Sequence, residues 1–80
     1  MSQPIDCIVT FHNGVEINAR LVITPLHGSG TVGRITEVQA SGDDAEVAEL
    51  LRGKHVNMQD CVIYLPPYVA TYQESALRGP

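Results

Sequence analysis

Basic residues are scarce in this chain of 80 residues, and the few that occur do not cluster. Five lysines and arginines stand against nine acidic residues, so the formal net charge is −4 at pH 7. Nucleic-acid-binding proteins normally carry a basic patch that neutralises phosphates. We therefore expect no nucleic-acid partner, and the acidic balance favours a basic protein instead. The basic residues are Arg20, Arg34, Arg52, Lys54 and Arg78.

Aromatic residues are also few, and tryptophan is absent. The hydrophobic content of 44% is ordinary for a folded protein, so the core must be built mainly from aliphatic side chains. We expect a single domain over residues 1–80, with 66–80 as a possible C-terminal arm. A domain of this size buries only about 60–65% of the surface that its unfolded chain exposes. This limited burial of surface favours completion of the core by self-association.

Long apolar runs and close pairs of metal ligands are missing as well. No segment has the ~20 apolar residues of a membrane-spanning helix, and the first residues lack the features of a signal peptide. Cys7 and Cys61 lie in apolar segments, which indicates reduced thiols in a cytoplasmic protein; a disulfide between the first and last strands is the alternative. The histidines His12, His27 and His55 are not spaced as zinc ligands, so we expect no metal and no other cofactor.

Two alternating segments at 5–11 and 15–24 predict a β-hairpin. A three-residue loop at 12–14 would pair Val9 with Ile17 and keep one face of the hairpin apolar. A two-residue Asn-Gly turn would instead place apolar residues opposite polar ones. With the longer loop, Gly14 takes the left-handed position and should have a positive φ.

A third strand is predicted at 33–39, although its apolar residues recur every three positions, so a short helix is the alternative. A helix over about 44–52 is predicted by a capping box of Asp43 and Glu46, and Gly53 would end it. The apolar stripe of this helix should be Val47, Leu50 and Leu51.

The remaining segments complete the predicted fold. Residues 55–58 are a possible short strand, and 61–65 form a continuous apolar strand that ends at two prolines. Residues 68–80 fit either a weak helix or an extended arm. We therefore predict an α+β fold, a mainly antiparallel sheet of four to five strands in the order β-β-β-α-β with one helix packed on it and a C-terminal arm or short helix. A small, partly open β-barrel is the alternative.

The segment 28–33, Gly-Ser-Gly-Thr-Val-Gly, matches the glycine pattern of dinucleotide-binding loops. Its context differs, because two strands of a hairpin precede it and strand residues follow it. We interpret it as a flexible loop. The alternative is a small-ligand or anion site at a subunit interface, in which backbone N–H groups bind the anion. That loop site would comprise His27, Gly28, Ser29 and Gly30.

Catalytic residues are not evident in the sequence. Ser29 near His27 is the one local nucleophile–base pair, and no third residue can be named that would orient the base. We therefore expect a non-enzymatic protein, although the ligand-binding alternative leaves room for a minor enzyme.

Two features favour a protein–protein interaction module. Acidic residues on the exposed side of the helix form either a solvated face or a docking surface for a basic partner, including a nucleic-acid-binding protein inhibited by phosphate mimicry. Large apolar residues beyond the last predicted strand either fold back on the sheet or form a homo-oligomer interface, together with a sheet edge. The acidic residues are Asp43, Asp44, Glu46 and Glu49, and the apolar ones are Tyr68, Val69, Tyr72 and Leu77.

Overall fold

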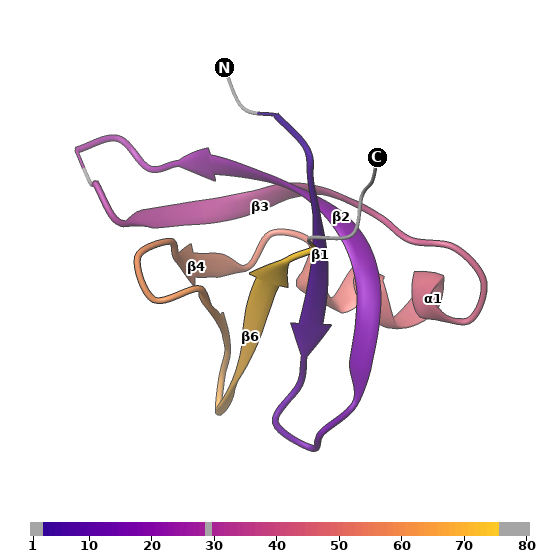
Figure 1. Cartoon of the computed structure of the whole chain (residues 1–80). Helices are drawn as coiled ribbons and strands as arrows, with labels where there is room; N and C mark the ends of the chain where they lie inside the picture. Colours follow the sequence, from indigo (N-terminus) through magenta and orange to yellow (C-terminus); the bar gives the residue numbers. More distant parts are fainter. Residues whose placement is uncertain (1–2, 29, 76–80) are drawn as a thin grey trace.

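A closed barrel of six antiparallel strands forms the body of the computed structural model, which describes residues 3–28 and 30–75 (Figure 1). Each strand pairs with the next along the chain, and the last strand closes the barrel on the first. A short helix α1 and a 3₁₀ turn η1 lie between the third and fourth strands. The elements are β1 (Ile5–Thr10), β2 (Glu16–Pro25), β3 (Val32–Gln39), α1 (Asp44–Ala48), η1 (Glu49–Leu51), β4 (His55–Asn57), β5 (Val62–Leu65) and β6 (Tyr68–Glu74).

The predicted α+β class is therefore wrong, and the barrel alternative was nearer, although this barrel is closed rather than partly open. The decisive segment is 68–74, expected to be an arm or a weak helix. It forms β6, which pairs with β5 on one side and β1 on the other. Pro66 and Pro67 are not the end of the sheet, because they form the turn of the β5–β6 hairpin, with a cis peptide bond between them. Proline has no N–H to donate to a ladder, but it can form such a turn.

The β1–β2 hairpin has the predicted register. Val9 pairs with Ile17 and Cys7 with Ala19, and all four side chains are buried. Gly14 has a φ of 89°, in the left-handed region that its loop position requires.

Strand β3 is confirmed, and its irregular periodicity has a structural cause. Val22 pairs with Glu37 whereas Ile23 pairs with Ile35, so Thr36 is an extra residue opposite the β2 strand. Such a bulge moves the following side chains to the other face of the sheet. Ile35 and Val38 are consequently both buried, three residues apart.

The helix is shorter than predicted, and its capping box does not form. Asp43 makes no side-chain capping hydrogen bond, and α-helix gives way to a 3₁₀ turn at Glu49. A 3₁₀ turn has three residues per turn rather than 3.6, which changes the side of the helix on which the last residues lie. Leu51 is fully buried in the barrel as expected, whereas Leu50 is 60% exposed. Gly53, with a φ of 83°, ends the turn as predicted.

Inward-facing residues of all six strands form the core, and α1 and η1 add Ala48 and Leu51 to it. The core is aliphatic apart from Cys7 and Tyr72, in agreement with the shortage of aromatic residues. No helix in the described part of the chain has the length and apolar composition needed to cross a membrane. Both the β1–β2 and β5–β6 turns point to the same end of the barrel, and the β2–β3 loop projects from its other side (Figure 1).

Candidate functional site

The outer surface of β5, β6 and residues 8–10 of β1 is made of uncharged side chains, with Asp6 of β1 at its border. Directly paired residues share a face of the sheet, and the pairs Ile63–Ala70 and Val9–Tyr72 are buried inside the barrel. The alternating pairs must therefore face outward. We call this surface the uncharged face; its residues are Ile8, Thr10, Val62, Tyr64, Val69, Thr71 and Gln73.

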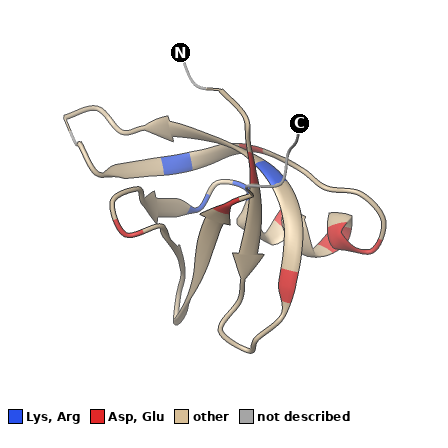
Figure 2. Cartoon of the chain, viewed as in Figure 1, with Lys and Arg blue, Asp and Glu red and all other residues tan. Residues whose placement is uncertain are grey.

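Apolar side chains of the uncharged face are accessible to solvent. Tyr64 and Val69 lie opposite each other on the β5–β6 hairpin and are 40% and 48% exposed. Charged residues occur only at the borders of this surface, for example Glu16, whose carboxylate accepts a hydrogen bond from the Thr10 hydroxyl at 3.5 Å. In Figure 2 the β5–β6 hairpin carries no charged residue up to Glu74.

A cleft of about 470 Å³, the mouth cleft, opens at the end of the barrel where the two hairpins turn. His12 and Tyr68 stack there, with ring centroids 3.8 Å apart and an interplanar angle of 3°. Their contact joins the β1–β2 turn to the start of β6. The walls are completed by η1 and the segment that follows it. The lining residues are Phe11, His12, Glu49, Leu50, Arg52, Lys54, Leu65, Pro66 and Tyr68.

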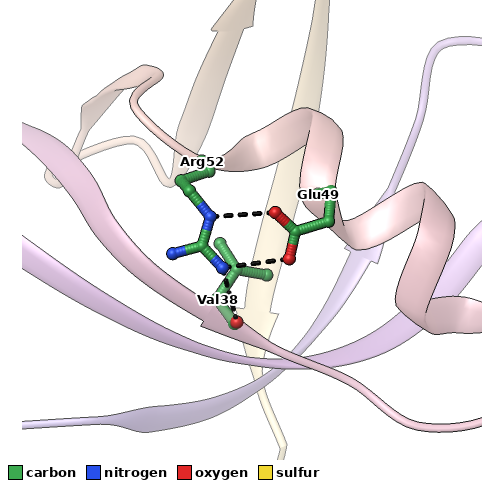
Figure 3. A network of polar contacts seen from close by, with 3 residues as sticks. All are labelled: Val38, Glu49 and Arg52. Atoms are coloured by element: carbon green, nitrogen blue, oxygen red, sulfur yellow. Dashed lines mark hydrogen bonds and ion pairs between the residues drawn. The ribbon is translucent and has the colours of Figure 1, made fainter.

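Three charged side chains line the mouth cleft, and two of them are paired with each other. Both carboxylate oxygens of Glu49 accept hydrogen bonds of 2.9 Å from the Arg52 guanidinium, which also donates to the Val38 carbonyl at 3.3 Å (Figure 3). This pairing lowers the pKa of Glu49 and raises that of Arg52. Among the described residues, the Lys54 ammonium has no carboxylate partner.

The four predicted acidic residues do not form one free surface. One Asp44 carboxylate oxygen accepts a hydrogen bond of 3.0 Å from the backbone N–H of Asn18. The pairing of β2 with β3 begins only at Arg20, so Asp44 supplies the acceptor that β3 does not provide there. Glu49 is held by Arg52. Asp43 and Glu46 remain as exposed carboxylates on α1.

The predicted homo-oligomer residues are separated in the structure. Val69 lies on the uncharged face, Tyr68 lines the mouth cleft, and Tyr72 points into the core with 8% of its surface exposed. Leu77 lies outside the described residues. Sequence reasoning did not identify Tyr64, although the complete absence of charge from residue 61 to residue 73 was a visible signal.

Gly28 and Gly30 of the glycine segment lie at the tip of the β2–β3 hairpin, and its last two residues belong to β3. Leu26 donates a backbone hydrogen bond to Val32 across the loop at 2.9 Å, and Gly28 has a φ of 82°. Nothing lies within 4 Å of the Cβ positions of Gly28 and Gly30, so the packing of the chain itself requires neither glycine. His27 is exposed in the same turn, and Ser29 lies outside the described residues.

The last glycine of that segment has a packing role instead. A Cβ on Gly33 would lie 2.8 Å from the Ile23 side chain and 3.0 Å from the Thr24 carbonyl oxygen. Gly33 is buried in β3, opposite Pro25. Gly33, one of the glycines that make the segment resemble a nucleotide-binding motif, is therefore required by the packing of the barrel itself.

Titratable groups with large shifts lie inside the barrel, behind the uncharged face. Burial, followed by the nearby carboxylates of Glu74 and Asp6, raises the pKa of the Cys7 thiol to about 12. Burial and the neighbouring Cys61 raise the pKa of the Tyr72 hydroxyl to about 12. Both cysteines are free thiols. Such shifts favour the neutral forms, which suits a core position rather than a reactive thiolate.

A second, wider cleft of about 780 Å³ lies between α1 and the start of β1. Polar and apolar groups line it in about equal measure, and its Arg20 and Asp6 side chains pair at 2.9 Å. Within residues 3–28 and 30–75, no group of three His, Cys, Asp or Glu side chains could hold a metal ion.

Comparisons were made with models of known protein families, with curated proteins and with solved structures. None of them found a match. The function must therefore be argued from the surfaces described above.

Proposed function

We propose that this protein is a non-enzymatic assembly module that associates with a second copy of itself through the uncharged face. The observation that carries the proposal is a strand surface with Tyr64 and Val69 exposed and no charge within it. Apolar area of this kind gains free energy when it leaves water. Tyrosine and aliphatic side chains surrounded by small polar residues are typical of interface centres.

A second copy is the partner that best fits the electrostatics. The chain has a net charge of −4, so two copies repel each other where acidic surfaces meet. In a two-fold contact the same patch faces itself, and an uncharged patch brings no like charges together. A basic partner would gain nothing from a surface without carboxylates. Association by strand addition is not expected, because every strand of the closed barrel already has two neighbours.

Solution mass measured by light scattering at a low and a high concentration tests this proposal. We expect the wild-type protein to form a defined oligomer as concentration rises. Val69→Lys places two ammonium groups at the centre of the contact and should return the mass to that of the monomer. Gln39→Lys, an exposed neutral position on β3, adds the same charge elsewhere and should leave the oligomer intact.

Two outcomes would overturn the proposal: a wild-type monomer at high concentration, or a Val69→Lys variant that keeps the oligomer. Far-UV circular dichroism and thermal unfolding of each variant confirm that the barrel is retained. Because Val69 is exposed, we expect its replacement to change stability by less than about 0.5 kcal/mol.

Docking of a basic protein on α1 is the second candidate function. Asp43 and Glu46 support it, since their carboxylates face solvent on one short helix. The support is weaker because Asp44 and Glu49 are already bound within the chain. We also propose a cytoplasmic location, which the two free thiols favour.

A further inference from the structure

The mouth cleft combines flat aromatic walls with the Lys54 ammonium, which has no carboxylate partner within residues 3–28 and 30–75, and neither feature is used by the proposed self-association. Its lining side chains face the barrel end, because Leu65 and Tyr68 pair in the inward register, whereas the uncharged face uses the outward register. The two surfaces can therefore be tested by different substitutions.

We propose that the mouth cleft binds a small planar carboxylate, an aromatic ring bearing an acidic side chain. The ring would lie in the cleft between the apolar residues of its walls and against the stacked rings of His12 and Tyr68. The carboxylate would pair with the Lys54 ammonium.

Apolar groups dominate the interior of the cleft. Phe11 and Leu65 are partly buried and pack against the core, so they form a fixed floor rather than mobile side chains. Leu50 and Pro66 are exposed at the sides. Leu50 is 60% exposed, and a ligand ring in the cleft would cover it. Aromatic ligands gain from such contacts through both area and stacking.

The charged side chains of the mouth cleft determine which charge its ligand should carry. Glu49 and Arg52 neutralise each other through two hydrogen bonds of 2.9 Å, and the guanidinium is further held by the Val38 carbonyl (Figure 3). Lys54 adds one positive charge that no carboxylate of the described residues balances. The three charged side chains of the lining sum to one positive charge on an acidic protein, and the Glu37 carboxylate acts on Arg52 from outside the lining; the sum over the lining favours an anion over a neutral or cationic ligand.

Size limits the ligand to a small molecule. The volume of about 470 Å³ falls in the range of roughly 300–1,000 Å³ that is usual for small-molecule sites. The cleft is also open on one side, bounded by two hairpin turns, η1 and the segment that follows η1, so we expect weak affinity. A one-ring or two-ring carboxylate fits these limits.

Indole-3-acetate is a suitable probe, because the chain contains no tryptophan and the indole fluorescence can be followed without interference. Indole-3-acetamide is its neutral counterpart and tryptamine its cationic one. We expect saturable binding of the acid, weaker binding of the amide and the weakest binding of tryptamine. Amide chemical shifts should change at Phe11, His12, Leu65 and Tyr68, and not at the β2–β3 tip.

Two variants separate the contribution of the Lys54 charge to binding from the contribution of the stacked His12 and Tyr68 rings. Lys54→Gln should weaken binding of the acid by about two- to fivefold and leave the amide unchanged, as expected for an exposed ion pair. Arg34→Gln removes an exposed cation outside the cleft and is the matched control. His12→Ala should weaken the acid and the amide by a similar factor of about three to ten. Raising the salt concentration should reduce the preference for the acid in the wild type only.

Several results would overturn the proposal. These are no saturable binding of indole-3-acetate, equal affinity for the acid and tryptamine, or an equal effect of Lys54→Gln and Arg34→Gln. Shifts confined to Tyr64 and Val69 would likewise reject the cleft, since they would place the probe on the uncharged face. The titration is repeated with Val69→Lys, which should bind the probe normally even if self-association is lost.

Discussion

The acidic surface of α1 and the uncharged face of the barrel differ in how far the fold already uses their side chains. Asp44 of α1 binds the backbone of β2 and Glu49 of η1 binds Arg52, so two of the four acidic residues Asp43, Asp44, Glu46 and Glu49 serve the chain itself. On the uncharged face, Tyr64 and Val69 point outward and are substantially exposed. A surface whose side chains have no internal role is the better candidate for a partner, and counting charges along the sequence cannot make that distinction.

The two surfaces also rest on different parts of the core. Helix α1 and η1 are attached through Ala48 and Leu51. The uncharged face is the outside of strands whose inner side holds Cys7 and Tyr72, the two groups with strongly raised pKa values. Substitution and pH can therefore disturb one surface at a time.

The largest expected effect concerns the attachment of the helix. Leu51 is fully buried, and Leu51→Ala leaves a cavity beneath η1. We expect a loss of about 2–5 kcal/mol in the free energy of unfolding, measured by urea denaturation. The adjacent Leu50 is the control: Leu50→Ala removes the same atoms from a side chain that is 60% exposed and should cost less than about 0.5 kcal/mol. Equal losses for the two variants would show that η1 does not have the described orientation.

That pair of leucines also shows the limit of sequence-based prediction. The i, i+3, i+4 pattern predicted both leucines on the buried stripe, which holds for an ideal α-helix. The transition to a 3₁₀ turn at Glu49 is set by packing against the barrel, and no local residue signals it. In contrast, the β1–β2 register could be predicted, because alternation and Gly14 agree on one loop.

The missed strand β6 has a similar physical explanation. Ala70 and Tyr72 are buried and alternate with exposed residues, but the same segment also fits a helical spacing. Pro66 and Pro67 were interpreted as a stop because proline breaks a ladder, and a proline turn between two strands looks identical in sequence. The choice depends on whether β1 has a free side to pair with, which is a property of the closed barrel. The mouth cleft depends on the same closure and could not be foreseen.

Alkaline pH should destabilise the strands that carry the uncharged face, because the groups that ionise lie inside the barrel behind it. The pKa of Cys7 is raised from 9.0 to about 12, and that of Tyr72 from 10.0 to about 12. Between the ordinary and the raised pKa, the unfolded chain has lost protons that the native protein still keeps. The contribution of these two groups to stability is therefore fully present below about pH 9 and is lost as the pH rises towards 12. Urea midpoints at about pH 8 and about pH 11 measure this loss.

Tyr72→Phe provides the comparison for that experiment. It keeps the ring in the core and removes one ionising group, so the decrease in stability between the two pH values should be smaller than in the wild type. Tyr68→Phe removes a hydroxyl from a tyrosine that is 52% exposed and should leave the decrease unchanged. If Tyr72→Phe retains the full wild-type decrease, the buried hydroxyl is not part of the effect.

The smallest expected effect distinguishes the two neighbouring aspartates of α1. Asp44→Ala removes the acceptor of the Asn18 N–H beyond the end of the β2–β3 pairing, and we expect it to cost about 1 kcal/mol. Asp43→Ala removes a carboxylate that makes no capping bond, so the unfolding free energy should change by less than about 0.5 kcal/mol. Amide hydrogen exchange gives a second measurement, since the Asn18 N–H should exchange faster in Asp44→Ala alone. If the two variants behave equally, Asp44 is, like Asp43, available to bind a partner. The acidic surface of α1 would then be as good a candidate for partner binding as the uncharged face.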